Sequence, residues 1–355
     1  MSRRSRAHER RSLLVLALAA LTFVTVQQVG GWLLRNRWPE VRFAGLEDLE
    51  RHARDARHRP VVAFLGSSRF GCGIKPTEIS RSWQSSSVWS LGEPLKFALP
   101  ACDSIAMEFI YANLRRQGLT PSVVVLEISP ETLADRCFWL NYHTTRQMGW
   151  HELFQLAGEL RDRQLLRPLA IGQSLPLWKY RSAMRHELLR LALPELPPRH
   201  PSVLEGDESK VAELMRILDR RRALPYEDRV EEGLAPLRTW FLAREYRVGG
   251  ANLAALERLM TRLRRENVQT VLVDVPVCKA QRALYSPTVE SQYQAALSLM
   301  RARHADLVHI EARALCADSL FSDNHHLTNE GGSRFSQFLA DELQSRLHAE
   351  LAQKR

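Results

Sequence analysis

Residues 61–68 read Val-Val-Ala-Phe-Leu-Gly-Ser-Ser. Five consecutive apolar residues predict a short strand that is buried on both faces. The Gly66-Ser67-Ser68 step then ends this strand and places a serine at its carboxyl end. Open α/β sheets bind ligands outside the carboxyl ends of their parallel strands. This stretch therefore predicts a parallel sheet and a candidate nucleophile, Ser68, at the edge of that sheet.

Similar apolar runs alternate with amphipathic helical patterns along the rest of the chain. The other predicted strands cover residues 123–128, 270–275 and 307–310, and the predicted helices cover 103–118, 252–266, 288–303 and 328–350, with a short helix from Pro76. Asp103 and Asn252 are suitable residues to cap two of these helices. Buried strands separated by helices are typical of a sheet covered on both sides. The predicted fold class is α/β, a three-layer α/β/α sandwich with a central parallel sheet.

Residues between about 138 and 250 interrupt this alternation. They are rich in Leu, Arg and Glu at helical spacing, contain no convincing strand, and are broken by four prolines between 194 and 201. We interpret them as a helical insertion that partly covers the site or binds a partner. The expected organisation is a basic tail at 1–12, a membrane span at 13–34, a linker at 35–60 and one α/β domain at 61–350.

The N-terminus indicates the compartment. Five arginines lie within residues 1–11, and residues 13–34 form an uncharged run of 22 residues, which is long enough to cross a bilayer as a helix. The arginines favour a cytoplasmic tail, by the positive-inside rule. We therefore expect an uncleaved, single-pass anchor in the inner membrane with the α/β domain in the periplasm. A cleavable signal peptide is the alternative, because polar residues and glycines weaken the second half of the run, namely Gln27, Gln28, Gly30 and Gly31.

Composition excludes some classes of function. The net charge is +10, but no basic stripe interleaved with aromatic residues suggests a nucleic-acid partner. A basic exterior could instead attract anionic lipid or an anionic polymer, and solvated helix faces explain it equally well. The chain has five cysteines and no C-x-x-C pair, so we expect neither a zinc site nor another metal or cofactor. These cysteines either form up to two disulfides or are scattered buried thiols.

A second motif complements the serine. Residues 323–328 read Asp-Asn-His-His-Leu-Thr, with Gly331 three residues further on, just before the last predicted helix. Acyl transfer through a serine needs a base to take its proton and an acid to hold that base in the correct tautomer. Asp323 and His326 could supply these two parts for Ser68.

Together the two motifs resemble those of the SGNH/GDSL hydrolase superfamily, in particular its membrane-anchored, extracytoplasmic branch associated with polysaccharide O-acylation. The resemblance covers residues 61–130 and 268–345, a little under half the chain. It implies that Ser68 takes the place of the serine in the family's Gly-Asp-Ser block, with Ser67 replacing the aspartate. It also implies that Asp323 and His326 match the family's Asp-x-x-His block, and that His325 lies outside it.

The family's oxyanion hole is less well matched. It combines the N–H of the nucleophile with a glycine N–H and an asparagine side chain. The resemblance implies that Ser68 and Gly92 supply the two N–H groups. The asparagine has no counterpart, because the end of the predicted strand reads Glu127-Ile128-Ser129-Pro130. For Glu127 a structural role is expected, and for Arg69 two roles stay open: contact with substrate, or a salt bridge at a helix end.

The function that the resemblance implies is a serine esterase or O-acyltransferase acting on a cell-envelope polysaccharide or another acylated glycan. An integral-membrane acyltransferase is the candidate donor partner, and the membrane is contacted through the N-terminal helix. The alternative is a non-catalytic scaffold or glycan-binding component of an export or acylation complex, which the missing asparagine favours.

Overall fold

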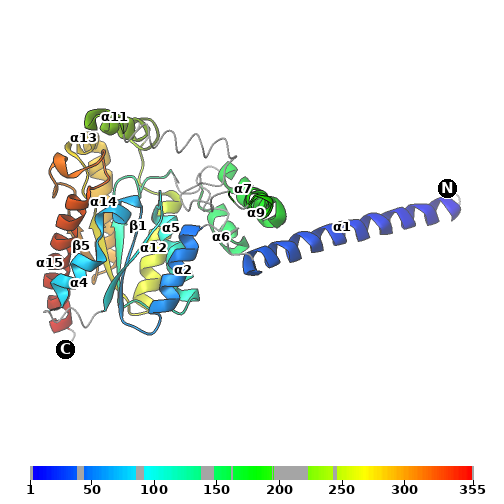
Figure 1. Ribbon diagram of the computed structural model, residues 1–355, viewed down its shortest axis with the longest axis horizontal. Helices are drawn as coiled ribbons and strands as arrows, with labels where there is room; N and C mark the ends of the chain where they lie inside the picture. Colours follow the sequence, from blue (N-terminus) through cyan, green and yellow to red (C-terminus); the bar gives the residue numbers. More distant parts are fainter. Residues whose placement is uncertain are drawn as a thin grey trace. The chain divides into compact units, whose positions relative to one another are not determined.

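The computed structural model describes residues 3–37, 44–84, 92–136, 148–160, 163–193, 195, 223–242 and 246–353 (Figure 1). The chain divides into two compact units. The first consists of Met1–Glu47, His143–Gly158 and Asp162–Val211, and the second of Asp48–Tyr142, Glu159–Arg161 and Ala212–Arg355. The second unit contains the sheet and all the candidate site residues.

A five-stranded parallel sheet forms the centre of the second unit. Its strands are β1 (Val61–Gly66), β2 (Glu93–Ala98), β3 (Val123–Ile128), β4 (Gln269–Asp274) and β5 (Val308–Glu311), in the order β2-β1-β3-β4-β5. The chain order reverses between β1 and β3, and ligands in open α/β sheets bind at such a reversal. The residues that follow β1 and β3 therefore lie at the expected place for a site.

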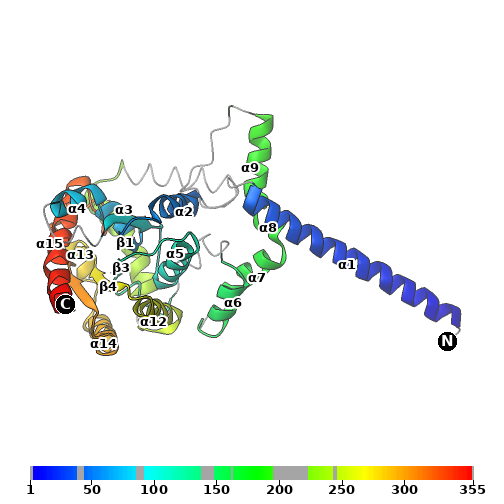
Figure 2. The same ribbon diagram turned by 90° about the horizontal axis from the view of Figure 1, so that it is seen from below.

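Helices cover both faces of this sheet (Figures 1 and 2). One face carries α5 (Ser104–Arg116) and α12 (Gly250–Arg265), which pack against each other. The other carries α3 (Ser68–Gly73), α4 (Pro76–Trp83), α14 (Pro287–Arg303) and α15 (Asn329–Gln353). Alternate strand residues such as Phe64 and Val125 pack with Phe335 of α15 in one core. The predicted three-layer α/β/α arrangement is confirmed.

Two local predictions in this unit were wrong. Strand β2 was not predicted because it is an edge strand with a mixed sequence, in which Pro94 is tolerated for lack of an outer neighbour. Helix α12 begins at Gly250 rather than being capped by Asn252. The Asn252 side chain is buried and donates instead to the Ala134 carbonyl, at 2.9 Å.

The N-terminal helix α1 (Arg3–Arg37) includes Arg11–Leu34, a segment long and apolar enough to cross a membrane. The stretch expected to be a linker contains the helix α2 (Ala44–Ala56), in which Leu46, Leu49 and Ala53 are buried at helical spacing. The described parts of the insertion are helical, as predicted. They form α6 (Trp150–Ala157), η5 (Arg163–Leu165), α7 (Leu166–Ser174), α8 (Pro176–Lys179), α9 (Arg181–Ala192), α11 (Tyr226–Pro236) and η6 (Leu237–Phe241).

Two short helices complete the second unit, α13 (Lys279–Arg282) and η7 (Asp318–Leu320). The four cysteines within the described residues, Cys72, Cys102, Cys278 and Cys316, are free thiols, and Cys137 lies outside the described residues. Of the two alternatives for the cysteines, scattered thiols therefore hold for these four.

Candidate active site

The candidate nucleophile stands on a tight turn between β1 and α3. Ser67 caps α3, because its Oγ accepts the Arg69 N–H at 3.1 Å, and Ser68 is the first residue of that helix. A Cβ atom on Gly66 would lie 2.5 Å from Glu127 Oε2. Glycine is therefore required at the end of β1, and the close approach that it permits fixes the direction of the turn.

The candidate base and acid stand on a closed loop ahead of α15. Phe321 and Leu327 form an isolated antiparallel bridge. Inside this bridge the Ser322 N–H donates to the His326 carbonyl at 2.7 Å. Thr328 then caps α15, since its hydroxyl accepts the Gly331 N–H at 3.2 Å. The Asp-x-x-His segment is thus held at both ends by backbone hydrogen bonds.

The three predicted residues come together although Ser68 and His326 are 258 residues apart in sequence. Ser68 Oγ lies 2.8 Å from His326 Nε2, and His326 Nδ1 lies 2.7 Å from Asp323 Oδ2. With the Nδ1–H tautomer, Asp323 accepts from the imidazole and the free Nε2 can accept the serine proton. Both distances are within ordinary hydrogen-bond range, so the geometry suits a general base next to a hydroxyl nucleophile.

The electrostatics of Asp323 favour its ionised form. Burial alone would raise its pKa, but the hydrogen bond from His326 and the positive charges that His325 and His326 can carry lower the pKa well below its usual range. Its Oδ1 also accepts the N–H groups of His325 at 2.9 Å and His326 at 2.8 Å. A carboxylate kept ionised in this way can orient the imidazole and stabilise its protonated form.

His325 does not join the chain of hydrogen bonds to Ser68. Its ring packs against that of His326 with the centroids 4.2 Å apart, tilted by 49°. The side chains of Asp323, His325 and His326 are close enough to hold a metal ion together. Both ring nitrogens of His326 already have protein partners in this arrangement. A metal on His326 would therefore displace Ser68 or Asp323.

A buried glutamate that the sequence did not assign to the site supports the nucleophile turn. Glu127, the second-last residue of β3, lies beside Gly66 and accepts the Ser67 N–H at 2.7 Å and the Ser67 hydroxyl at 2.6 Å. Burial raises the pKa of Glu127, while the charge of Arg69 and these hydrogen bonds oppose the rise. The structural role expected for Glu127 is therefore seen, and its partner is the turn that carries Ser68. Strand register, which sequence does not give, would have been needed to find this contact.

Arg69 lies in a buried ion pair. Its guanidinium is 3.4 Å from a carboxylate oxygen of Glu131, and only 10% of its side chain is exposed. Glu131 also accepts from the Tyr285 hydroxyl at 2.9 Å and from Gln281 Nε2 at 3.0 Å. The side chain thus has little surface for substrate. Of the two roles left open for Arg69, the structure favours the salt bridge and corrects the expectation of a substrate-binding residue.

The prediction that Gly92 contributes to the oxyanion hole is wrong. Gly92 lies directly before β2, and an added Cβ would be 2.2 Å from the carbonyl carbon of Pro60. Because β1 and β2 are parallel, this is the amino edge of the sheet, with the length of β1 between Gly92 and Ser68. Strands rise about 3.3 Å per residue, so Gly92 is roughly 15 Å or more from the nucleophile. The Gly92 N–H therefore cannot donate to an oxyanion at Ser68. The prediction failed because strand β2, which begins after Gly92, was not recognised in the sequence.

The loop after β2 lies on the correct edge. The Leu99 N–H donates to the Gly66 carbonyl at 3.0 Å, which holds this loop against the nucleophile turn. Within it, Ala101 has a φ of +55°, in the left-handed region that residues other than glycine seldom adopt. Strained backbone of this kind concentrates at functional sites. No pattern in the sequence points to Ala101.

Helix α11 packs on the loop that carries the Asp–His pair. Arg229 Nε donates to the Ser322 carbonyl at 2.8 Å. A Cβ on Gly233 would lie 1.9 Å from Asn324 Oδ1, so helix and loop are in close contact. Burial, and then the negative charges of neighbours that include Asp323, raise the pKa of Tyr226 to about 12. This part of the predicted insertion therefore packs against the loop that carries Asp323 and His326.

The fold and the site define a class of protein: a parallel α/β domain with a Ser–His–Asp chain of hydrogen bonds at the carboxyl edge of its sheet. No family model matches the chain, and no curated protein matches its sequence. A solved structure described as "a putative platelet activating factor from Streptococcus pneumonia" is similar over 90% of this chain and 98% of its own, with 13% identity and a TM-score of 0.38.

Proposed function

We propose that the protein is a membrane-anchored serine esterase or O-acyltransferase that acts on an acylated glycan of the cell envelope. The observation that carries the proposal is the continuous chain from Ser68 Oγ through His326 to Asp323, with contacts of 2.8 and 2.7 Å. Two further features support it. The Asp323 carboxylate is kept ionised, and the Ser68 turn is held by the buried Glu127.

In the proposed reaction Ser68 Oγ attacks an ester carbonyl and gives its proton to His326 Nε2. Asp323 holds the Nδ1–H and stabilises the imidazolium. Collapse of the tetrahedral intermediate expels the alcohol, which takes the proton from His326, and leaves an acyl group on Ser68. Water or a sugar hydroxyl then attacks the acyl group and gives its proton to His326. As the bond between the acyl group and Ser68 breaks, His326 gives this proton to Ser68 Oγ, which restores both residues.

The oxyanion needs donors that do not move during the reaction. We assign this role to the Ser68 N–H and to the backbone of the loop after β2, where Ala101 is strained. Leu99 ties that loop to Gly66, next to the nucleophile turn. The segment after β3 supplies no amide side chain. Its Ser129 N–H and Thr132 hydroxyl bond to each other, at 2.8 Å.

The test is hydrolysis of an acetyl ester by the full-length protein in detergent, first with p-nitrophenyl acetate and then with an O-acetylated polysaccharide. We expect turnover that Ser68→Ala removes and Ser67→Ala lowers only in part, since Ser67 caps the helix and carries no proton in the reaction. Turnover that survives in Ser68→Ala would rule out the assignment of the nucleophile.

A second candidate function is a glycan-binding scaffold that keeps the fold without catalysis. The missing asparagine donor favours it, since loss of one oxyanion donor costs about 100- to 1000-fold in turnover. The two candidates separate in the cell: a scaffold would keep its function in Ser68→Ala and His326→Ala, whereas the enzyme would lose it.

The proposed location is the inner membrane, with α1 as an uncleaved single span and the α/β domain in the periplasm. Contacts inside the first unit support retention of α1. Added Cβ atoms on Gly30 and Gly31 would lie 2.7 Å from Leu177 and 2.2 Å from Pro176, so α1 and α8 pack closely. The intact mass of protein purified from membranes should include residues 13–34. A mature chain that begins after residue 20 would contradict the anchor.

A further inference from the structure

The first unit has features that the proposed reaction does not use. Helix α1 packs through its last turns on α8, where Gln27 Oε1 accepts the Leu177 N–H at 3.1 Å. Leu34 packs with Tyr180, Leu177 and Met184 in a small core. Three of the four residues that weaken the apolar run of α1, namely Gln27, Gly30 and Gly31, thus form its contact surface for α8. The fourth, Gln28, donates through Nε2 to the Gln173 carbonyl of α7 at 3.5 Å. These residues carry a helix–helix contact that a removable leader would not need.

This contact fixes the depth of α8 and α9, if α1 spans the membrane as proposed above. Gln27 and Gly31 lie seven and three residues before Leu34, the end of the apolar segment. At 1.5 Å per residue, α8 therefore lies about 5 to 10 Å inside the outer end of the span. Helices that lie in the surface of a bilayer are buried to about this depth.

The orientation of α9 agrees with this depth. In Figure 1 α9 is seen nearly end-on while α1 lies across the view, and Figure 2 shows α9 lengthwise at a wide angle to α1. With α1 along the membrane normal, α9 therefore runs across the normal rather than along it (Figures 1 and 2).

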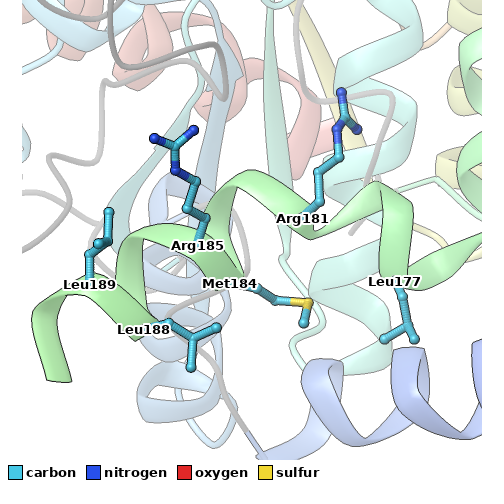
Figure 3. A pocket seen from close by; sticks show the side chains of 6 residues that line it. All are labelled: Leu177, Arg181, Met184, Arg185, Leu188 and Leu189. Atoms are coloured by element: carbon cyan, nitrogen blue, oxygen red, sulfur yellow. The ribbon is translucent and has the colours of Figure 1, made fainter. Parts of the chain in front are cut away.

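Most of the side chains that α8 and α9 present around an open groove are divided as in an interfacial helix. Leu177 of α8 and Met184 and Leu188 of α9 point to the side on which α1 lies (Figure 3). Arg181 and Arg185 point to the opposite side, together with Leu189 (Figure 3). These six residues line the groove, which has a volume of about 370 Å³. Leu188 is 55% exposed and Leu191 is 76% exposed.

We propose that α8 and α9 lie in the outer leaflet of the inner membrane, with Leu188 in the acyl boundary and Arg185 on anionic phospholipid headgroups. Depth, orientation and the separation of apolar from basic side chains all point to a lipid surface. Trp178 is half-exposed, and the Arg181 guanidinium carbon lies over its ring, 3.7 Å from the ring centroid. Tryptophan is enriched at the level of the headgroups. Such a surface would hold the first unit flat on the membrane where α1 emerges.

The test uses the full-length protein in nanodiscs, with spin labels on single introduced cysteines and with the unsubstituted protein as the background for native thiols. Leu188→Cys reports on α9, and Leu21→Cys and Leu33→Cys form a depth scale along α1. The matched control is Leu299→Cys on α14, an exposed leucine of the α/β unit. Accessibility to oxygen and to a water-soluble nickel chelate is compared for each label.

We expect the Leu188 label to favour oxygen as strongly as the Leu33 label, and the Leu299 label to favour nickel. Addition of phosphatidylglycerol to phosphatidylcholine discs should deepen the Leu188 label, and Arg185→Gln should remove that change. A Leu188 label open to nickel, or closed to both reagents as in a protein contact, overturns the proposal. If neither phosphatidylglycerol nor Arg185→Gln changes the depth of the Leu188 label, the proposed contact between Arg185 and the anionic headgroups is wrong.

A bilayer signal at Leu21 with a water signal at Leu188 would refute the lipid surface and leave the anchor intact. A water signal at Leu21 would refute the anchor itself and, with it, the depth on which the surface depends. Neither result bears on the chemistry of Ser68, which lies in the other unit.

Discussion

At the scale of single residues, we predict different losses of activity for alanine substitutions at the two adjacent histidines. His326 bridges Ser68 and Asp323, whereas the ring of His325 packs on that of His326 and lies outside the hydrogen bonds to Ser68. His326→Ala should lower kcat by roughly 10⁴-fold or more, because the serine loses its base. His325→Ala should cost less than about tenfold, equivalent to about 1.4 kcal/mol in the barrier. Ester hydrolysis by the two variants decides between them, and a larger loss in His325→Ala would show that the base is misassigned.

The lowered pKa of Asp323 predicts that the stability of the fold depends on pH. The pKa of Asp323 in the folded protein is lowered, mainly by the hydrogen bond from His326 against the effect of burial. An unfolded aspartate has a pKa of about 3.9. The carboxylate therefore stabilises the fold above about pH 4, and this contribution is lost as the pH falls further. Urea unfolding at several pH values should show a stability difference between wild type and Asp323→Asn that shrinks below pH 4. An equal difference at pH 7 and pH 3 would contradict the assigned ionisation.

We predict that removal of the Glu127 carboxylate lowers both the stability and the activity of the protein. Glu127→Ala leaves the Ser67 N–H and hydroxyl without their buried acceptor, beside the charge of Arg69. The cost should be roughly 3 kcal/mol in the free energy of unfolding, with a fall in kcat. Glu127→Gln keeps an acceptor oxygen of the same shape and should recover most of the activity. If Glu127→Ala lost stability but kept kcat, the glutamate would have no part in placing Ser68.

At the scale of elements, the contact between α11 and the Asp–His loop is the most sensitive. Gly233→Ala would place a methyl group 1.9 Å from Asn324 Oδ1, next to Asp323. The buried Asn324 side chain must move, and its hydrogen bond to Gln281 moves with it. We expect this shift to reach Asp323, where a displacement of about 1 Å can cost about 100-fold in turnover. Gly71→Ala on α3 is the matched control, because nothing lies within 4 Å of its added Cβ. The kcat values of the two variants should therefore differ by about 100-fold. Equal kcat values would show that the contact with α11 does not position the Asp–His loop.

The predictability of each element followed from its burial. Strands β1 and β3 are buried at every position, and their unbroken apolar runs made them easy to predict. Edge strand β2 has four half-exposed positions and a proline among its six residues, a sequence that is typical of a loop. That omission shifted Gly92 to the wrong edge. Ser68, Asp323 and His326 were predictable because their chemistry is local to two short motifs, whereas Glu127 and Ala101 depend on register and backbone strain.

At the scale of the whole molecule, the chain combines a parallel α/β unit with a unit that contains α1. In the second unit, the topology of the sheet brings residues from near its start and near its end to one edge. The first unit would hold the protein at the membrane surface, in our proposal. The two roles are separate, so variants in α9 should leave ester hydrolysis in detergent unchanged.

The central claim is that Ser68 is an activated nucleophile, and covalent labelling tests it most directly. The full-length protein is treated with a fluorophosphonate, and the modified peptide is located by mass spectrometry. The account predicts an adduct on Ser68 that is absent from Ser68→Ala, is slowed strongly by His326→Ala, and persists in Ser67→Ala. A folded protein that gives no adduct on Ser68, or one that is labelled equally after Ser68→Ala, would contradict it.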